Sequence, residues 1–204
     1  MNDYKMRIGL LTSLLWVWIG SCQIIGAEPL SNRDSLSRIT FPSLETILPI
    51  LESEVANFED EIALDSIAFQ LSNEHPDERL LYAVYVSEDD PHPYYFVEYF
   101  SDGRVEIKER NFPAPNKHPY IIDSSEWKVD VNEAWQLFIS NPEIRPIDES
   151  ELECSSLMLF YKDLSEGYRL VWKLAIKPCE GEGIIQYHLD ANTGEYLGVD
   201  GANN

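Results

Sequence analysis

The stretch that decides the fold runs from Tyr168 to Gly198 and reads YRLVWKLAIKPCEGEGIIQYHLDANTGEYLG. Between 168 and 177, large apolar side chains alternate with basic or smaller ones, the period of a strand with one buried face. A second apolar run, 184–189, ends at an Asp-Ala-Asn-Thr-Gly sequence, whose residue types favour a tight reversal. We expect the Asp190 carboxylate to accept backbone N–H bonds inside this turn. The stretch therefore predicts an antiparallel sheet with one buried face.

The composition indicates a folded protein and limits the kinds of partner that it can bind. The chain has 204 residues, 44% of them hydrophobic and 12% aromatic, which is enough for a core and argues against wholesale disorder. Its formal net charge of −21 repels nucleic acid and anionic lipid headgroups, and favours cationic partners or none. We interpret the acidic runs 52–61 and 148–153 as solvated faces, with weak binding of a divalent ion or a cationic peptide as the alternative.

The first 27 residues have the features of a signal peptide. Lys5 and Arg7 precede an apolar run over 8–19, which is too short to span a bilayer. Two ends fit this leader: cleavage after Ala27, or a bacterial lipobox, Ile-Gly-Ser-Cys, that would make Cys22 a lipidated N-terminus. No later segment is apolar enough to span a membrane. The chain is thus expected to be exported to the periplasm or outside the cell, either soluble or anchored through Cys22.

The remaining cysteines, Cys154 and Cys179, form an even pair in an oxidising compartment. If Tyr161 pairs with Tyr168 in a hairpin, Cys154 lies opposite a residue near 175. Cys179 would then be close enough to bridge if the strand end bends. We predict a Cys154–Cys179 disulfide.

Upstream, the pattern predicts a linker over 28–42 and then a first unit over 43–112. This unit has a helix near 49–58 and a second helical segment carrying Leu64, Ile67, Ala68 and Leu71 at i, i+3, i+4, i+7 spacing. Three strands follow, at about 80–86, 94–100 and 104–109, before a proline-rich boundary.

The same order recurs in a second unit over 120–200. Asp130 and Glu133 predict a capping box for a helix that runs to Asn141. Strands follow at about 152–161, 168–177 and 183–189, with a short tail at 196–199. Two matches support a repeat: 68–71 with 134–137, and 94–97 with 168–171. The predicted fold is α+β, with two tandem units that each pack a helix on a three-stranded antiparallel sheet.

Residues 127–199 resemble the PepSY domain family. The resemblance depends on an Ala on the buried face of the helix, a Tyr-x-Leu-Val-Trp-x-Leu strand and an Asp-Ala-x-Thr-Gly-Glu-x-Leu turn. It implies a helix on a small cystatin-like sheet, and a role in restraining secreted proteases or in binding at the cell envelope. Unlike a propeptide, this chain carries no protease, and residues 43–112 match the family only as a degenerate copy. The matching residues are Ala134, Val171, Trp172, Asp190, Ala191, Thr193, Gly194, Glu195 and Leu197.

The sequence contains no HExxH, no GxSxG and no phosphate-binding glycine loop, and it indicates no catalytic, cofactor or metal residues. His188 is expected to be either hydrogen-bonded or solvent-facing. We therefore expect a non-enzymatic binding or regulatory protein with a protein or peptide partner, a protease among the candidates. The alternatives are an envelope scaffold and an enzyme on a cystatin-like scaffold.

Overall fold

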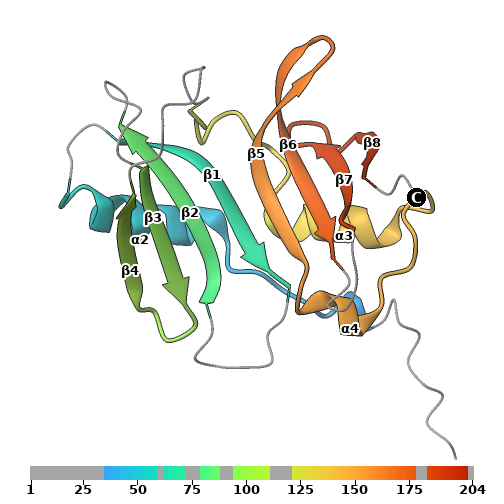
Figure 1. Cartoon of the computed structure of the whole chain (residues 1–204), viewed down its shortest axis with the longest axis horizontal. Helices are drawn as coiled ribbons and strands as arrows, with labels where there is room; N and C mark the ends of the chain where they lie inside the picture. Colours follow the sequence, from blue (N-terminus) through green and yellow to red (C-terminus); the bar gives the residue numbers. More distant parts are fainter. Residues whose placement is uncertain are drawn as a thin grey trace, which may run out of the picture. The chain divides into compact units, whose positions relative to one another are not determined.

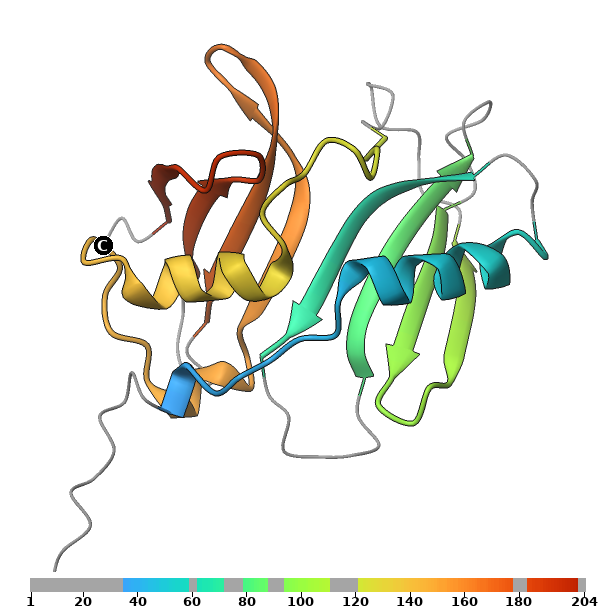
Figure 2. The same cartoon turned by 180° about the vertical axis from the view of Figure 1, so that it is seen from behind.

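The protein is built on one antiparallel sheet of eight strands with two helices on one of its faces. The computed structural model describes residues 35–58, 62–71, 79–87, 94–110, 121–177 and 183–201. The strand order is β4-β3-β2-β1-β5-β6-β7-β8, so the sheet is continuous from one edge to the other. Figure 1 shows α2 and α3 behind the strands, and Figure 2 shows them from their own side, each crossing one half of the sheet.

The first half consists of helix α2 and four strands. Helix α2, Leu44–Val55, buries one apolar stripe against the sheet: Leu44, Ile47, Leu48, Leu51 and Val55. The strands form an antiparallel meander in which each pairs with the next. Their bounds are Ile62–Gln70 for β1, Arg79–Ser87 for β2, Tyr94–Phe100 for β3 and Val105–Arg110 for β4.

The second half repeats this layout. Helix α3, Val131–Ser140, is followed by the one-turn helix α4, Glu149–Leu152, and by a second meander. Trp135, Phe138 and Trp172 are fully buried between helix and sheet. The strands are Ser156–Leu164 for β5, Gly167–Ile176 for β6, Ile185–Asp190 for β7 and Tyr196–Asp200 for β8.

The two halves share one sheet and one core. Strand β1 pairs antiparallel with β5, through 67–70 and 156–159, and the buried apolar side chains form a single cluster that extends across both halves. The expectation of two tandem units with a three-stranded sheet each is therefore wrong. Exposed edges on two small sheets would leave backbone groups unpaired, and the β1–β5 ladder pairs these edges with each other.

The second helix expected in the first unit is strand β1. A β-bulge between Leu64 and Ser66 inserts Asp65, so Leu64 and Ile67 lie three residues apart and still face the same core. Phe69 and Leu71 continue that face two and four residues later. The bulge thus reproduces part of the i, i+3, i+7 spacing of an amphipathic helix, which explains the error.

Both residue matches behind the expected repeat are also wrong. The first matches a stretch of β1 with a stretch of α3, and the second matches the third strand of one half with the second strand of the other. The described part of the expected linker, 35–42, is packed rather than loose. Leu36 and Phe41 are buried, and the Trp135 indole Nε1 donates a hydrogen bond to the Leu36 carbonyl at 2.9 Å.

Candidate functional site

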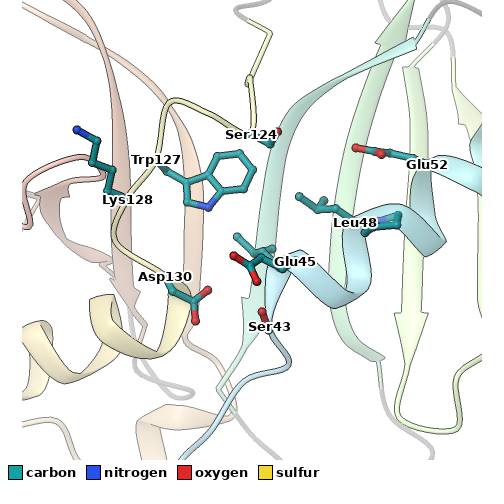
Figure 3. A pocket seen from close by; sticks show the side chains of 10 residues that line it. Ser43, Glu45, Leu48, Glu52, Ser124, Trp127, Lys128 and Asp130 are labelled. Carbon is teal, nitrogen blue, oxygen red and sulfur yellow. The ribbon is translucent and has the colours of Figure 1, made fainter.

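A cleft lies between helix α2 and the segment 121–130, which leads into α3 (Figure 3). Backbone hydrogen bonds hold this segment at both ends. The amide of Ile122 donates to the carbonyl of Leu64 on β1, at 2.7 Å, and the amide of Val129 donates to the carbonyl of Ala191, at 3.0 Å. One wall of the cleft is therefore a helix and the other is an anchored loop.

The cleft has two parts, both open to solvent, which we name outer and inner because only the second is lined by strands of the sheet. The outer part, of about 580 Å³, extends along the first turns of α2, and the inner part, of about 430 Å³, reaches strands β1 and β2. Both volumes are in the range of small-molecule and side-chain sites. The two parts have four lining residues in common, so we treat them as one, the α2 groove. These four residues are Leu48, Glu52, Ser124 and Trp127.

Trp127 is the aromatic centre of the α2 groove. Its ring projects from the segment toward α2 in Figure 3 and is only partly buried against the core. The other two tryptophans of the described chain, Trp135 and Trp172, are fully buried, and each donates its indole N–H to a carbonyl. A partly exposed indole in a groove offers an apolar and cation-attracting face to a ligand.

Three carboxylates line the same part of the groove as this ring. Glu45 and Glu52 come from α2, and Asp130 precedes α3 with its carboxylate directed toward the start of α2 (Figure 3). Asp130 is the N-cap residue of α3, but its side chain makes no capping hydrogen bond, so the expected capping box with Glu133 is absent. No ion pair among the described residues involves Glu45, Glu52 or Asp130.

The positions of two of these acids also suit the helices that carry them. Glu45 lies in the first turn of α2, and Asp130 lies at the start of α3. The positive ends of the helix dipoles stabilise negative charge there. The only basic residue that lines the outer part, Lys128, directs its amine away from α2 (Figure 3). The α2 groove is therefore an acidic site with an aromatic centre.

The inner part of the α2 groove contains a polar group that lacks a partner. Tyr85 on β2 is 1% exposed, and its buried hydroxyl makes no hydrogen bond in the described structure. Burial, and then the negative charge of Glu52, raise the pKa of Tyr85 above its usual value. The phenol is therefore neutral, and it can both donate and accept a hydrogen bond.

The motif residues of the second half have structural roles. The Asp190 carboxylate accepts the amides of Asn192 and Thr193, at 2.8 and 2.9 Å, which confirms the expected turn. Gly194 has φ +72°, and a Cβ there would lie 2.8 Å from the Leu137 side chain of α3. The turn thus packs directly against the helix. Ala134, Trp172 and Ala191 are buried in the core.

Several predicted residues lie outside the described chain. These are the leader 1–27 with Cys22, and Cys179. Cys154, exposed after α4, is disulfide-bonded, and both other cysteines of the protein are outside the described residues. Its pairing with Cys179 stays a prediction. A titration of the unfolded mature protein that finds two free thiols would contradict it.

His188 belongs to a second cluster, on the sheet face opposite the helices. It is 2% exposed, its Nδ1 lies 3.1 Å from the Lys162 amine, and Lys162 also forms an ion pair with Asp200. Burial is the main cause that lowers the pKa of His188 to about 4, and the neighbouring Lys162 adds to it. His188 is therefore neutral and buried beside Lys162. Of the two expectations, a hydrogen-bonded or a solvent-facing side chain, the structure supports the first.

Sequence reasoning missed the residues that form the α2 groove. No sequence pattern sets Trp127 and Tyr85 apart from core aromatics. The partial exposure of Trp127 and the missing hydrogen-bond partner of Tyr85 are properties of the packing. Glu52 was included in an acidic run for which cationic-peptide binding was the alternative reading. Within the described ranges, no three His, Cys, Asp or Glu side chains converge as a metal site. None of the described helices is long and apolar enough to cross a membrane.

The fold resembles that of one solved structure from Clostridium difficile 630, a protein described provisionally as a lipoprotein. The two share 12% sequence identity with a TM-score of 0.53, and the match covers 81% of this chain and 97% of that chain. At this identity the likeness shows the fold alone. No protein-family model matches the chain, and none of the curated proteins matches it. The PepSY resemblance therefore stays a prediction.

Proposed function

We propose that this is a non-catalytic binding protein of the cell envelope, which holds a basic, partly apolar segment of a partner protein in the α2 groove. The observation that carries the proposal is a groove lined by a half-buried Trp127 and three carboxylates that form no ion pair with any described residue. A cation attracted by Glu45, Glu52 and Asp130 would also contact the indole face, where Trp is the preferred aromatic partner.

The rest of the groove suits the apolar part of such a segment. Leu48 is 6% exposed at the junction of the outer and inner parts, and Ile62 and Leu64 line the inner part. Lysine and arginine side chains have aliphatic stems that bury along apolar surface while the charged end stays among polar groups. The large negative charge of the whole chain would also speed the encounter with a basic partner.

The location is proposed on two grounds. The leader 1–27 predicts export, and the protein of similar fold is described provisionally as a lipoprotein. We propose the lipidated form, with Cys22 as the first residue of the mature chain. The intact mass of protein purified from cells that express the full chain tests this. A mature chain that begins at Glu28 would contradict lipidation and leave soluble export.

A titration with a defined peptide tests the binding function. The probe is a short peptide of alternating lysine and leucine, and the reference is the same peptide with glutamate in place of lysine. We expect the lysine peptide alone to change the fluorescence of Trp127, with an affinity that falls as salt is added. A Trp127→Phe variant should lose the signal, because Trp135 and Trp172 are fully buried.

A pair of matched triple variants localises the site. Replacing Glu45, Glu52 and Asp130 by their amides should weaken binding about tenfold or more. The control variant replaces three exposed acids outside the groove, Glu54, Glu133 and Glu153, and removes the same charge. Equal weakening by both variants would show general charge attraction and would refute the α2 groove as the site.

A secreted protease is the kind of partner that the PepSY resemblance implies. Purified protein added to a panel of secreted proteases should slow the one whose surface supplies the basic segment. If no rate changes and no protease binds, the protease version is wrong, and the peptide titration still decides the binding function.

A further inference from the structure

The inner part of the α2 groove contains an unusual defect for a folded protein. A phenol hydroxyl buried without a hydrogen bond destabilises the folded state, and such groups in native structures call for an explanation. Tyr85 is 1% exposed and its hydroxyl has no partner in the described structure. Phenylalanine would fill the same space without the polar atom. The hydroxyl is therefore a candidate ligand contact.

The surroundings of this hydroxyl define the chemistry of the missing partner. The inner part is lined by apolar side chains that include Leu48, Ile62 and Leu64, and by the carboxylates of Glu52 and Asp123. Glu52 and Trp127 border both parts of the groove. A fitting ligand group therefore has an apolar stem and a positively charged end that donates hydrogen bonds. The neutral Tyr85 hydroxyl would accept one of these bonds, and the Glu52 carboxylate would balance the charge.

We propose that the inner part of the α2 groove is a specificity pocket for the ammonium group of a lysine side chain. The proposal rests on the proposed binding function and names the group recognised there. Lysine fits better than arginine because its compact ammonium donates in three separate directions, to single acceptors. The polar side chains that line the inner part are Glu52, Asp123, Ser124 and Tyr85. Acceptors on four separate side chains suit a group that donates in several directions better than a planar fork.

The stem of the lysine would lie between Trp127 and Leu48. Leu48 is buried on the groove side of α2, and Trp127 faces it from the segment 121–130 (Figure 3). Four methylene groups extend far enough to carry the ammonium from the outer to the inner part while their surface is covered by these two side chains. The same arrangement disfavours an acidic side chain, which would meet Glu52.

The test uses four peptides that differ at one central residue: lysine, arginine, norleucine and Nε-acetyl-lysine. Norleucine keeps the aliphatic stem, and acetyl-lysine keeps the length without the charge. We expect the lysine peptide to bind about tenfold more tightly than the norleucine and acetyl-lysine peptides, and severalfold more tightly than the arginine peptide.

Two phenylalanine variants decide whether Tyr85 is responsible. Tyr85→Phe should remove most of the preference for lysine over norleucine and should abolish the preference over arginine. Tyr82→Phe is the matched control, because Tyr82 lies on the same strand β2 but on the opposite face of the sheet, and it should change neither preference. Chemical denaturation of each variant shows that it is folded.

The outcomes separate this inference from the proposed function. If basic peptides bind through Glu45, Glu52 and Asp130 but lysine is not preferred, or Tyr85→Phe leaves the preference intact, the lysine pocket is wrong and the binding function stands. If no basic peptide binds, both are wrong.

Discussion

The two halves of the sheet have the same layout, a helix across an antiparallel meander, but they differ in what surrounds the helix. In the second half, the turn at Gly194 contacts Leu137 of α3, and Trp172 donates its indole N–H to the Val129 carbonyl at 2.8 Å. In the first half, α2 faces the segment 121–130 across an open groove, and the Tyr85 hydroxyl beneath it has no partner among the described residues. The helix of the second half is therefore closely packed against the turn and the sheet, whereas the helix of the first half borders an open groove that can bind a ligand.

This difference shows where a function can reside in a pseudo-repeated fold. In the second half, the residues of the Asp190–Glu195 turn and of strand β6 that the sequence singled out serve in hydrogen bonds and packing. The first half carries two of the three groove carboxylates, Glu45 and Glu52, and a buried hydroxyl at Tyr85, none of which has an ion pair or hydrogen bond among the described residues. These are local departures from the most stable arrangement. Such departures are expected at functional sites, because binding groups must stay available to a ligand.

The largest expected effect contrasts two tryptophans. Trp172→Ala should lower the free energy of unfolding by about 3–5 kcal/mol, because it leaves a large cavity and an unpaired carbonyl at Val129. Trp127→Ala should cost only about 1 kcal/mol, since its ring is partly exposed. Urea denaturation of both variants measures the difference. Equal losses would mean that Trp127 is as much a core residue as Trp172.

A second prediction concerns how the stability of the folded protein depends on pH through the buried His188. The unfolded chain binds a proton at this residue near the ordinary pKa of 6.5, and the folded chain binds it only near a pKa of about 4. Between these values the unfolded state holds more protons, so stability should fall as the pH is lowered from about 6.5 to 4, by at most about 3 kcal/mol.

The variant His188→Gln isolates this effect from the other acidic groups. It should flatten the slope of stability against pH over this window, and the stability curves of the two proteins should converge as the pH falls. Parallel curves would contradict the assignment. The neighbouring charges on β5, β6 and β8, namely Lys162, Lys173 and Asp200, are retained in both proteins.

A smaller effect is expected at two glycines with similar backbone angles. Gly194→Ala should cost about 1–2 kcal/mol, because its φ is +72° and the new Cβ would crowd Leu137. Gly103→Ala, in the β3–β4 turn, has φ +84° and nothing within 4 Å of the new Cβ. It should cost about 1 kcal/mol from the backbone alone. Thermal denaturation compares them, and a lower cost at Gly194 would contradict the tight packing of the second half.

The smallest effect has the opposite sign. Tyr85→Phe should raise the free energy of unfolding by about 1 kcal/mol, because it removes a buried hydroxyl that has no hydrogen bond within the described part of the chain. The control Tyr82→Phe, on the other face of β2, should leave stability nearly unchanged. Denaturant titration of both variants is the measurement. A loss of stability in Tyr85→Phe would show that the hydroxyl has a partner in solution.

Much of the second half could be read from the sequence. The alternation before Ile176 predicts β6, the Asp190 turn is as expected, and the helix after Asp130 is found at Val131–Ser140. The first half was harder, because the bulge at Asp65 gave β1 a helix-like spacing. The α2 groove could not be predicted at all. It depends on how close α2 lies to the segment 121–130, which is more than 60 residues further along the chain.

By itself, the sequence determined the alternating strands and the closing turn of the second half, because each of these is set by residues that are close together in the chain. Only the tertiary structure decided that the two meanders join through β1 and β5 into one sheet, since pairing between distant strands follows from which edges must be covered. It also decided which carboxylates and which hydroxyl stay unpaired beside α2. A missing partner is a property of the packed molecule and has no signature in the order of residues.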